Sequence, residues 1–181
     1  MGTTESRGIA LTLVHAAVLV FAGAACVTDL RDGRIPNVLT FGAIALAFVV
    51  HALLPQGSGL AHVGFGLLVG LAVFFPFFAL GGMGAGDVKL MAAIGAWLGP
   101  ALAVLTALHG AIAGGVLAIG VALSTGYLKT AFVNLRRMVL HWRVNGIEPV
   151  PELTLDHNKG PRLAYAVPIF IGLLVTLWRT S

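Results

Sequence analysis

The sequence has few charged side chains. Only 10% of its residues are Asp, Glu, Lys or Arg, whereas 58% are hydrophobic. A water-soluble domain carries about 25% charged residues, because its surface must be hydrated. A water-soluble fold is therefore excluded, and the sequence predicts an all-α integral membrane protein.

Cysteine is also nearly absent. Cys26 is the one cysteine in the sequence, which excludes an intramolecular disulfide framework and a four-cysteine zinc module. The formal net charge is +4, but the basic residues are few and scattered. Nucleic-acid-binding domains concentrate lysine and arginine on one face, so no nucleic-acid partner is expected.

Six apolar runs are candidates for membrane-spanning helices, since a helix needs roughly 20 apolar residues to cross the hydrocarbon core. These runs are residues 9–28, 37–54, 60–80, 88–107, 109–126 and 162–179. A tight turn is expected near His109 and Gly110. We predict one membrane-embedded domain over residues 1–181, a six-helix bundle in which glycines allow close helix contacts. The glycines predicted at such contacts are Gly64, Gly66, Gly70, Gly115 and Gly120.

The lysines and arginines predict the orientation, because cytoplasmic loops of membrane proteins are enriched in these residues. With the amino terminus outside, nine of the 11 basic residues fall on the inner side. These nine are Arg31, Arg34, Lys89, Lys129, Arg136, Arg137, Arg143, Lys159 and Arg162. The sequence thus predicts an N-out, C-out protein of the inner (plasma) membrane, with loops 29–36 and 81–88 facing the cytoplasm.

Residues 127–143 differ from the apolar runs. Apolar side chains recur there at helical spacing, and basic side chains fall mainly between them. This pattern is typical of a basic amphipathic helix that lies on the anionic inner leaflet, between helices five and six. The alternative is a cytoplasmic extension of the fifth helix. Residues 144–161 are polar and rich in proline and glycine, and are predicted to form a loop.

Two aspartates occupy corresponding places in this topology. Asp29 follows the first apolar run and Asp87 precedes the fourth, so both are expected at the inner ends of their helices. Ionisable residues close to a membrane span are costly and indicate function. Two close carboxylates share one proton. The ionised one can then take a proton from water while the protonated one polarises a carbonyl, which is general acid–base hydrolysis without metal or cofactor. The pair titrates as a unit, so acid and base are not assigned.

A glycine-rich segment, residues 81–86, precedes Asp87. So much glycine disfavours a helix and leaves backbone groups free to pair with a substrate strand. On the other side, Gly33 and the segment 35–37 turn the chain into the second helix, which Asn37 can cap. Lys89 is expected to anchor the fourth helix at the membrane interface.

Other roles for these residues stay open. Asp29 could pair with Arg31 or Arg34, and Asp87 could simply cap the fourth helix. Asp32 is assigned to the loop surface or an ion pair, with a substrate contact as the alternative.

Two other functions are also considered. One is a proton-coupled transporter, in which membrane aspartates relay protons across the bilayer. The other is a metal site on the outer side, formed by His51, His62 and His109, with His15 deeper.

Two segments resemble one protein family. Gly84-Ala85-Gly86-Asp87 looks like the Gly-x-Gly-Asp motif of intramembrane aspartyl peptidases, and residues 28–37 are similar to the first-aspartate motif of type IV prepilin leader peptidases. The segment from Pro161 to Leu174 is similar to that family's last helix. The resemblance implies that Asp29 and Asp87 are catalytic and that Gly84 and Gly86 shape the loop. It also implies the substrate: prepilins cut at the cytoplasmic face.

The sequence departs from the larger, bifunctional members of this family. Those enzymes carry an amino-terminal region with paired cysteines and also methylate the new amino terminus. This sequence, with Cys26 alone, resembles the short peptidase-only branch that serves tight-adherence (Flp) pili. Methyltransferase activity and S-adenosylmethionine are therefore not expected. The expected partners are prepilin precursors and the lipid bilayer, and the oligomeric state stays unknown.

Overall fold

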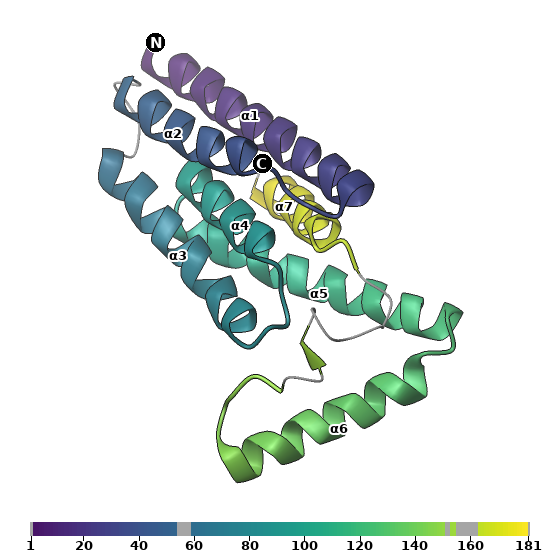
Figure 1. Ribbon diagram of the computed structural model, residues 1–181. Coiled ribbons are helices and arrows are strands. Elements are labelled where there is room, and N and C mark those ends of the chain that lie inside the picture. Colours follow the sequence, from purple (N-terminus) through teal and green to yellow (C-terminus); the bar gives the residue numbers. More distant parts are fainter. Residues whose placement is uncertain (1, 54–58, 151–152, 155–162, 181) are drawn as a thin grey trace.

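The computed structural model describes residues 2–53, 59–150, 153–154 and 163–180, with the backbone alone described for residues 2–10. This part of the chain forms seven helices (Figure 1). They are α1 (Gly2–Asp32), α2 (Asn37–Leu53), α3 (Gly59–Ala79), α4 (Ala85–Leu98), α5 (Pro100–Ser124), α6 (Leu128–Asn145) and α7 (Ala166–Thr180). Lys159, Pro161 and Arg162, which entered the predictions above, lie outside the described residues.

Three of these helices are long and apolar enough to cross a membrane: Leu11–Asp32 within α1, all of α3 and all of α5. The helices α2 and α7 are apolar but shorter. The prediction of an all-α membrane protein is confirmed for the described residues, whereas only three helices meet the length and hydropathy expected of a membrane span. The six predicted apolar runs do not match the observed helices one for one. The fourth run, residues 88–107, combined α4 with the start of α5, whereas α4 has only 14 residues and is about 21 Å long.

The break between α4 and α5 lies at Gly99, not near His109 and Gly110 as predicted. Gly99 has φ 83° and donates its N–H to the carbonyl of Gly95 at 2.8 Å, which ends α4. Pro100 then begins α5, at the helix position where a missing N–H costs nothing. Hydropathy does not register this break, because apolar residues continue on both sides of it. His109 instead lies within α5, where its Nδ1 hydrogen-bonds to Thr176 Oγ1 of α7 at 2.8 Å.

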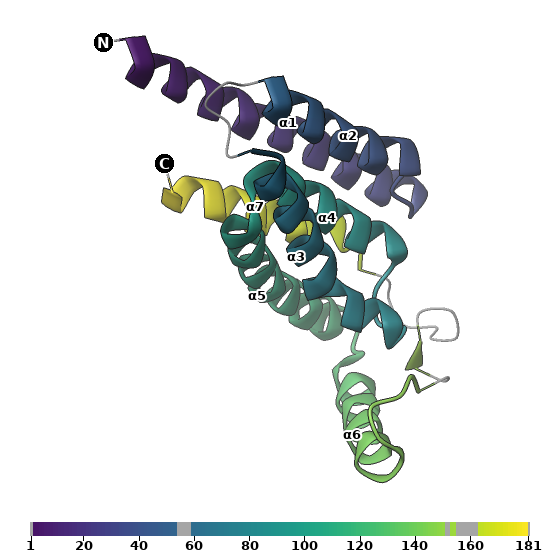
Figure 2. The ribbon, with the colours of Figure 1, turned by 90° about the vertical axis from the view of Figure 1, so that its left-hand side faces the viewer.

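Helix α4 is the buried centre of the bundle (Figure 2). Every residue from Leu90 to Leu98 is buried, and α4 contacts α1, α2, α3, α5 and α7. An apolar helix of 10–14 residues is typical of such a core position. Trp97 fixes its far end, since Nε1 donates a 2.8 Å hydrogen bond to the carbonyl of Ala43 in α2.

Glycines bring α3 and α4 together. Gly66 and Gly95 face each other so closely that a Cβ on either would run into the other's carbonyl, and Gly70 packs in the same way on the carbonyl of Met91. In lipid, helices associate through this kind of close packing rather than by expelling water. The predictions for Gly66 and Gly70 are confirmed.

The close contact between α5 and α7 uses other glycines than those predicted. A Cβ on Gly172 of α7 would run into the backbone of Gly110 and Thr106 in α5. The predictions for Gly64, Gly115 and Gly120 were wrong, because no described atom lies within 4 Å of a Cβ built there. Glycine content alone does not say which face of a helix meets a neighbour.

Helix α6 stands apart from the bundle in both views (Figures 1 and 2), and none of its residues is buried. A turn at residues 125–127, with Gly126 at φ 68°, separates it from α5. It is therefore a helix of its own, and the alternative of a continuous extension of the fifth helix was wrong.

Figure 2 shows both chain termini at one end of the bundle, while the α1–α2 turn and the α3–α4 loop lie at the other end. The two segments that carry Asp29 and Asp87 are thereby placed side by side.

Candidate active site

The first segment of the site is the α1–α2 turn. Gly33, with φ 62°, ends α1 by donating its N–H to the carbonyl of Asp29 at 3.0 Å. The carbonyl of Pro36 then accepts the N–H groups of Leu39 and Thr40. Pro36 therefore occupies the cap position of α2, and the prediction that Asn37 caps this helix was wrong. Asn37 is the first helical residue, which frees its side chain for another contact.

The second segment is the start of α4. Gly84 is the residue before the helix, and its carbonyl accepts the Asp87 N–H at 3.2 Å. The Gly84 N–H in turn donates to the Asp87 carboxylate. An acid in the first turn that reaches back in this way is half of a capping box. Asp87 therefore does cap α4, which was the alternative role considered from the sequence. It also lines the pocket next to the α1–α2 turn.

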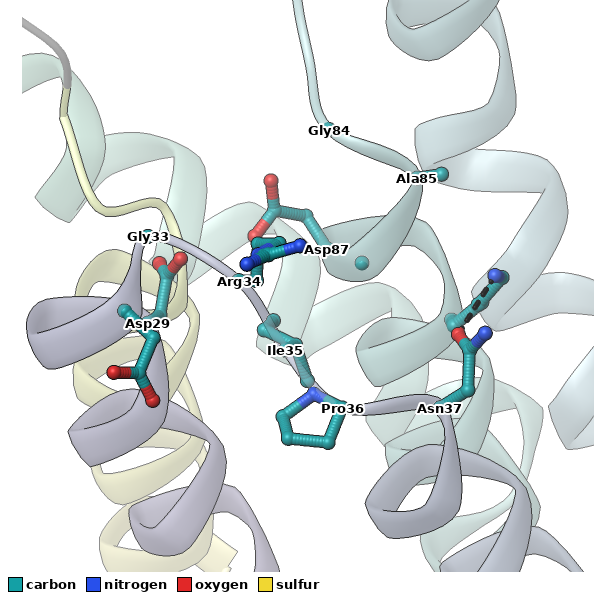
Figure 3. Close-up of a pocket in the computed structure, with 12 residues that line it drawn as sticks. Asp29, Gly33, Arg34, Ile35, Pro36, Asn37, Gly84, Ala85 and Asp87 are labelled. Atoms are coloured by element: carbon teal, nitrogen blue, oxygen red, sulfur yellow. Dashed lines mark hydrogen bonds between the residues drawn. The ribbon is translucent and has the colours of Figure 1, made fainter.

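One pocket of about 770 Å³ lies between the two segments (Figure 3), a size within the usual range for ligand sites. Figure 3 shows Asp29 at the end of α1 and Asp87 at the start of α4, on either side of the α1–α2 turn in this view. The pocket is lined by Asp29, Asp32, Gly33, Arg34, Ile35, Pro36, Asn37, Gly84, Ala85, Gly86, Asp87 and Lys89. All four predicted site residues therefore share one cavity, and Asp32 lies there as well.

The two aspartates differ in their surroundings. Asp29 is half-buried, whereas Asp87 is only 9% exposed. Asp87 lies in the first turn of α4, outside the three candidate membrane spans. Burial raises the pKa of its carboxyl from 3.8 to about 7, with a further contribution from the negative charge of Asp29, against the opposing effect of the Gly84 amide. A carboxyl with such a pKa is partly protonated at neutral pH, which suits a proton donor.

A side chain would be crowded at both motif glycines, Gly84 and Gly86, by a different neighbour in each case. A Cβ on Gly84 would lie 3.1 Å from Asp87 Oδ2, so a side chain there would crowd the carboxylate. A Cβ on Gly86 would lie 3.2 Å from the Cβ of Ile35, which is a buried residue of the α1–α2 turn. Gly86 therefore allows the two segments to approach each other.

Lys89 connects the segments on the far side of the pocket. Its Nζ donates a 3.0 Å hydrogen bond to Asn37 Oδ1, drawn as a dashed line in Figure 3, and lies 5.5 Å from the centre of the Phe41 ring. The sequence predicted an interfacial anchor. That role stays a prediction, and the structure adds a specific partner for this side chain.

The sequence missed the contribution of α7. The N–H of Ala166, at the start of α7, donates to Asp29 Oδ2 at 3.3 Å. The preceding residue, Tyr165, lies near the other carboxylate: burial raises the pKa of its phenol, and the charge of Asp87 raises it further. A backbone donor leaves no mark in a sequence, so only the fold could reveal it.

The histidines considered as metal ligands have other contacts. His51 Nδ1 donates to the carbonyl of Ala47 at 2.9 Å, and His62 packs against Gly99, while His109 bonds to Thr176. Within the described ranges, no three His, Cys, Asp or Glu side chains gather as metal ligands would. The arrangement does not support the outer-side metal site.

The chain resembles one known protein family. No curated protein and no solved structure matches the chain. A family model, described as the type IV leader peptidase family, matches residues 16–119. The match covers more than half of the chain and includes both segments that line the pocket, although not α6 or α7. With this match and the shared pocket of Asp29 and Asp87, the chain belongs to the type IV leader peptidase family.

Proposed function

We propose that this protein is a membrane aspartyl endopeptidase that removes the leader peptide of prepilins of the type IV or Flp class. The observation that carries the proposal is the shared pocket of Asp29 and Asp87, which lies within the segment matched by the leader peptidase family. Gly84 and Gly86 supply the clearance that this pocket needs.

The proposed chemistry is general acid–base hydrolysis. One carboxylate takes a proton from a water molecule, whose oxygen attacks the carbonyl carbon of the scissile peptide bond. The other carboxyl gives its proton to the carbonyl oxygen, which forms a neutral tetrahedral diol. Transfer of a proton to the amide nitrogen then breaks the C–N bond and releases the leader as a carboxylic acid. The raised pKa of Asp87 supports this scheme, because one proton is retained in the pair near neutral pH.

The substrate would reach the pair from the side of the α3–α4 loop. Residues 80–84 include Gly81 at φ 75° and lie outside the helices. The N–H groups of Leu80, Gly81 and Gly82 already bond to carbonyls of α3, so an extended peptide would pair mainly with carbonyl oxygens of this loop. We propose that this end of the bundle faces the cytoplasm. It carries the basic residues Arg31, Arg34 and Lys89, as inner loops do.

We further propose that the apolar parts of six helices, α1 to α5 and α7, are embedded in the membrane, with Asp87 at the inner boundary and α6 on the inner leaflet. The exposure of α6 supports this placement, because a helix with basic and apolar side chains and no buried residue needs an external apolar environment. The Ile35-Pro36-Asn37 turn favours the branch that serves tight-adherence pili over the other branches.

A proton-relay transporter fits the arrangement less well. Its carboxylates would be expected along a path through the bilayer, whereas Asp29 and Asp87 line one pocket at one end of the bundle.

The test is leader removal from a purified pilin precursor by the protein in liposomes. The wild type should cleave, and Asp29→Asn and Asp87→Asn should each fold but lose at least about 10³-fold in rate, since each removes one half of the acid–base pair. Glu148→Gln is the matched control, because Glu148 is an exposed acid that does not line the pocket, and it should retain full activity. Full cleavage by either of the first two variants would remove that residue from the mechanism.

A further inference from the structure

The first turn of α7 contacts the proposed catalytic pair. The Ala166 N–H donates to Asp29 Oδ2 at 3.3 Å and thereby joins residues 137 positions apart. Ala166 is fully buried and Asp29 is half-buried, so the donor of this bond is shielded from water while the carboxylate still reaches the pocket. The N–H groups at the start of a helix have no partner within the helix, and the helix dipole favours negative charge there. Asp29 therefore accepts a donor suited to a carboxylate rather than to a neutral acid.

The second carboxyl has the opposite surroundings. Asp87 is 9% exposed, and burial in an apolar setting favours the neutral form of a carboxyl. Among the described residues, the other ionisable groups that face the pair come from four elements. They are Cys26 from α1, Asp32 and Arg34 from the α1–α2 turn, Lys89 from α4, and Tyr165 before α7. Lys89 is engaged by Asn37, while Asp32 and Arg34 are exposed to solvent. The clearest asymmetry between the two carboxyls is thus the α7 amide on one and deep burial of the other.

We infer that the start of α7 divides the roles within the pair, with the Ala166 amide positioning Asp29 as the general base and leaving Asp87 as the general acid. This inference rests on the proposed function. The ionised Asp29 takes the proton from water through the oxygen that is not held by Ala166. Asp87 gives its proton to the carbonyl oxygen of the peptide as the water oxygen attacks. Asp29 then returns its proton to the leaving nitrogen, and Asp87 recovers one as the diol collapses.

The direct test changes one atom. An α-hydroxy acid introduced at position 166 replaces the backbone N–H by an ester oxygen and keeps the methyl side chain. We expect kcat for leader removal to fall roughly tenfold or more, as for the loss of a hydrogen bond to a charged group. The KM should stay within about twofold, because Ala166 does not line the pocket.

The matched control is the same ester at Val167. Its N–H donates to the carbonyl of Ala164 at 3.1 Å, so the control removes a neighbouring backbone bond without touching Asp29. Both proteins should unfold at similar temperatures. An equal loss of kcat in the two esters, or no loss at Ala166, would overturn the role of α7.

The location of the proton is tested without any substrate. At about pH 6, below the raised pKa of Asp87, the infrared band of a protonated carboxyl should vanish in Asp87→Asn and persist in Asp29→Asn. The reverse pattern would overturn the assignment. If the wild type cleaves no pilin precursor, the proposed function fails instead, and the infrared result still decides which carboxyl holds the proton.

Discussion

Lys89 Nζ and Asn37 Oδ1 form a 3.0 Å hydrogen bond that joins the start of α4 to the start of α2. Both residues line the pocket of Asp29 and Asp87. Lys89 follows Asp87 by two positions, and Asn37 follows the turn that ends α1. This bond therefore holds together the two segments that carry the aspartates, at the side of the pocket away from α7.

The first prediction is that Lys89→Gln slows leader removal by about threefold to tenfold, less than either aspartate change. A shorter, neutral side chain loses the charged donor, and such bonds contribute about 1.5–3 kcal/mol, less where they are exposed. Asn37→Ala should have a similar effect, and the double variant should be no slower than the worse single one, because both remove the same bond.

The measurement is kcat/KM for the four proteins of this double-mutant cycle. Lys129→Gln is the matched control, since Lys129 is exposed on α6 and should leave the rate unchanged. Strictly additive effects of the two pocket substitutions would show that the bond does not position the aspartates.

The second prediction concerns Gly86. In Gly86→Ala the new Cβ would lie 3.2 Å from the Cβ of Ile35, so the α1–α2 turn must shift relative to Asp87. The shift needed is a few tenths of an ångström. We expect the cleavage rate to fall by about threefold to tenfold, because a misplacement of about 1 Å can cost about 100-fold. The melting temperature should change much less than the rate.

Gly115→Ala is the control for this substitution. Gly115 also lies within a helix, but no described atom is within 4 Å of the added Cβ. Alanine there should stabilise the protein by about 0.5–1 kcal/mol and leave the rate unchanged. A Gly86→Ala enzyme with wild-type activity would show that the contact with Ile35 tolerates a side chain.

A third prediction is that a chelator leaves the cleavage rate unchanged. The candidate ligands are occupied elsewhere: His51 by the carbonyl of Ala47 and His109 by Thr176. Inhibition by a chelator that is reversed on adding Zn²⁺ would contradict this and revive a metal-dependent mechanism.

The residues around Asp29 and Asp87 were predictable because their signals are local. Glycine and proline mark the ends of helices within a few positions, and an acid beside an apolar run stands out against its surroundings. The structure accordingly places Asp29, Asp87, Gly84 and Gly86 around one pocket. The family match supports the resemblance that these motifs carried.

Other features depend on packing between distant segments, which one sequence does not display. Hydropathy continues across Gly99 and Pro100, so the short, buried α4 was merged with the first part of α5. From the sequence, the polar side chain of Asn37 could either cap α2 or bond to a distant residue such as Lys89. Which of the two it does depends on where α4 packs. The donor to Asp29 is the backbone of Ala166, to which the residue type gives no clue.

The last prediction concerns pH. Asp87 has a pKa of about 7 in the folded protein and 3.8 as the reference value. Between these values the folded state binds more protons than the unfolded state, so the free energy of unfolding falls as pH rises through this window. The contribution of neutral Asp87 is complete below about pH 4 and lost above about pH 7. Activity should decline over the upper part of the same window, as the general acid loses its proton.

Two variants separate Asp87 from the other carboxyls. Asp87→Asn cannot ionise there, so its unfolding free energy in detergent should lose the downward slope between about pH 4 and pH 7. Asp29→Asn should keep most of that slope, because burial contributes more than the charge of Asp29 to the pKa of Asp87. If instead Asp29→Asn abolished the slope, mutual repulsion rather than burial would hold the proton in the pair. The division of roles would then depend on both carboxyls rather than on the depth of Asp87.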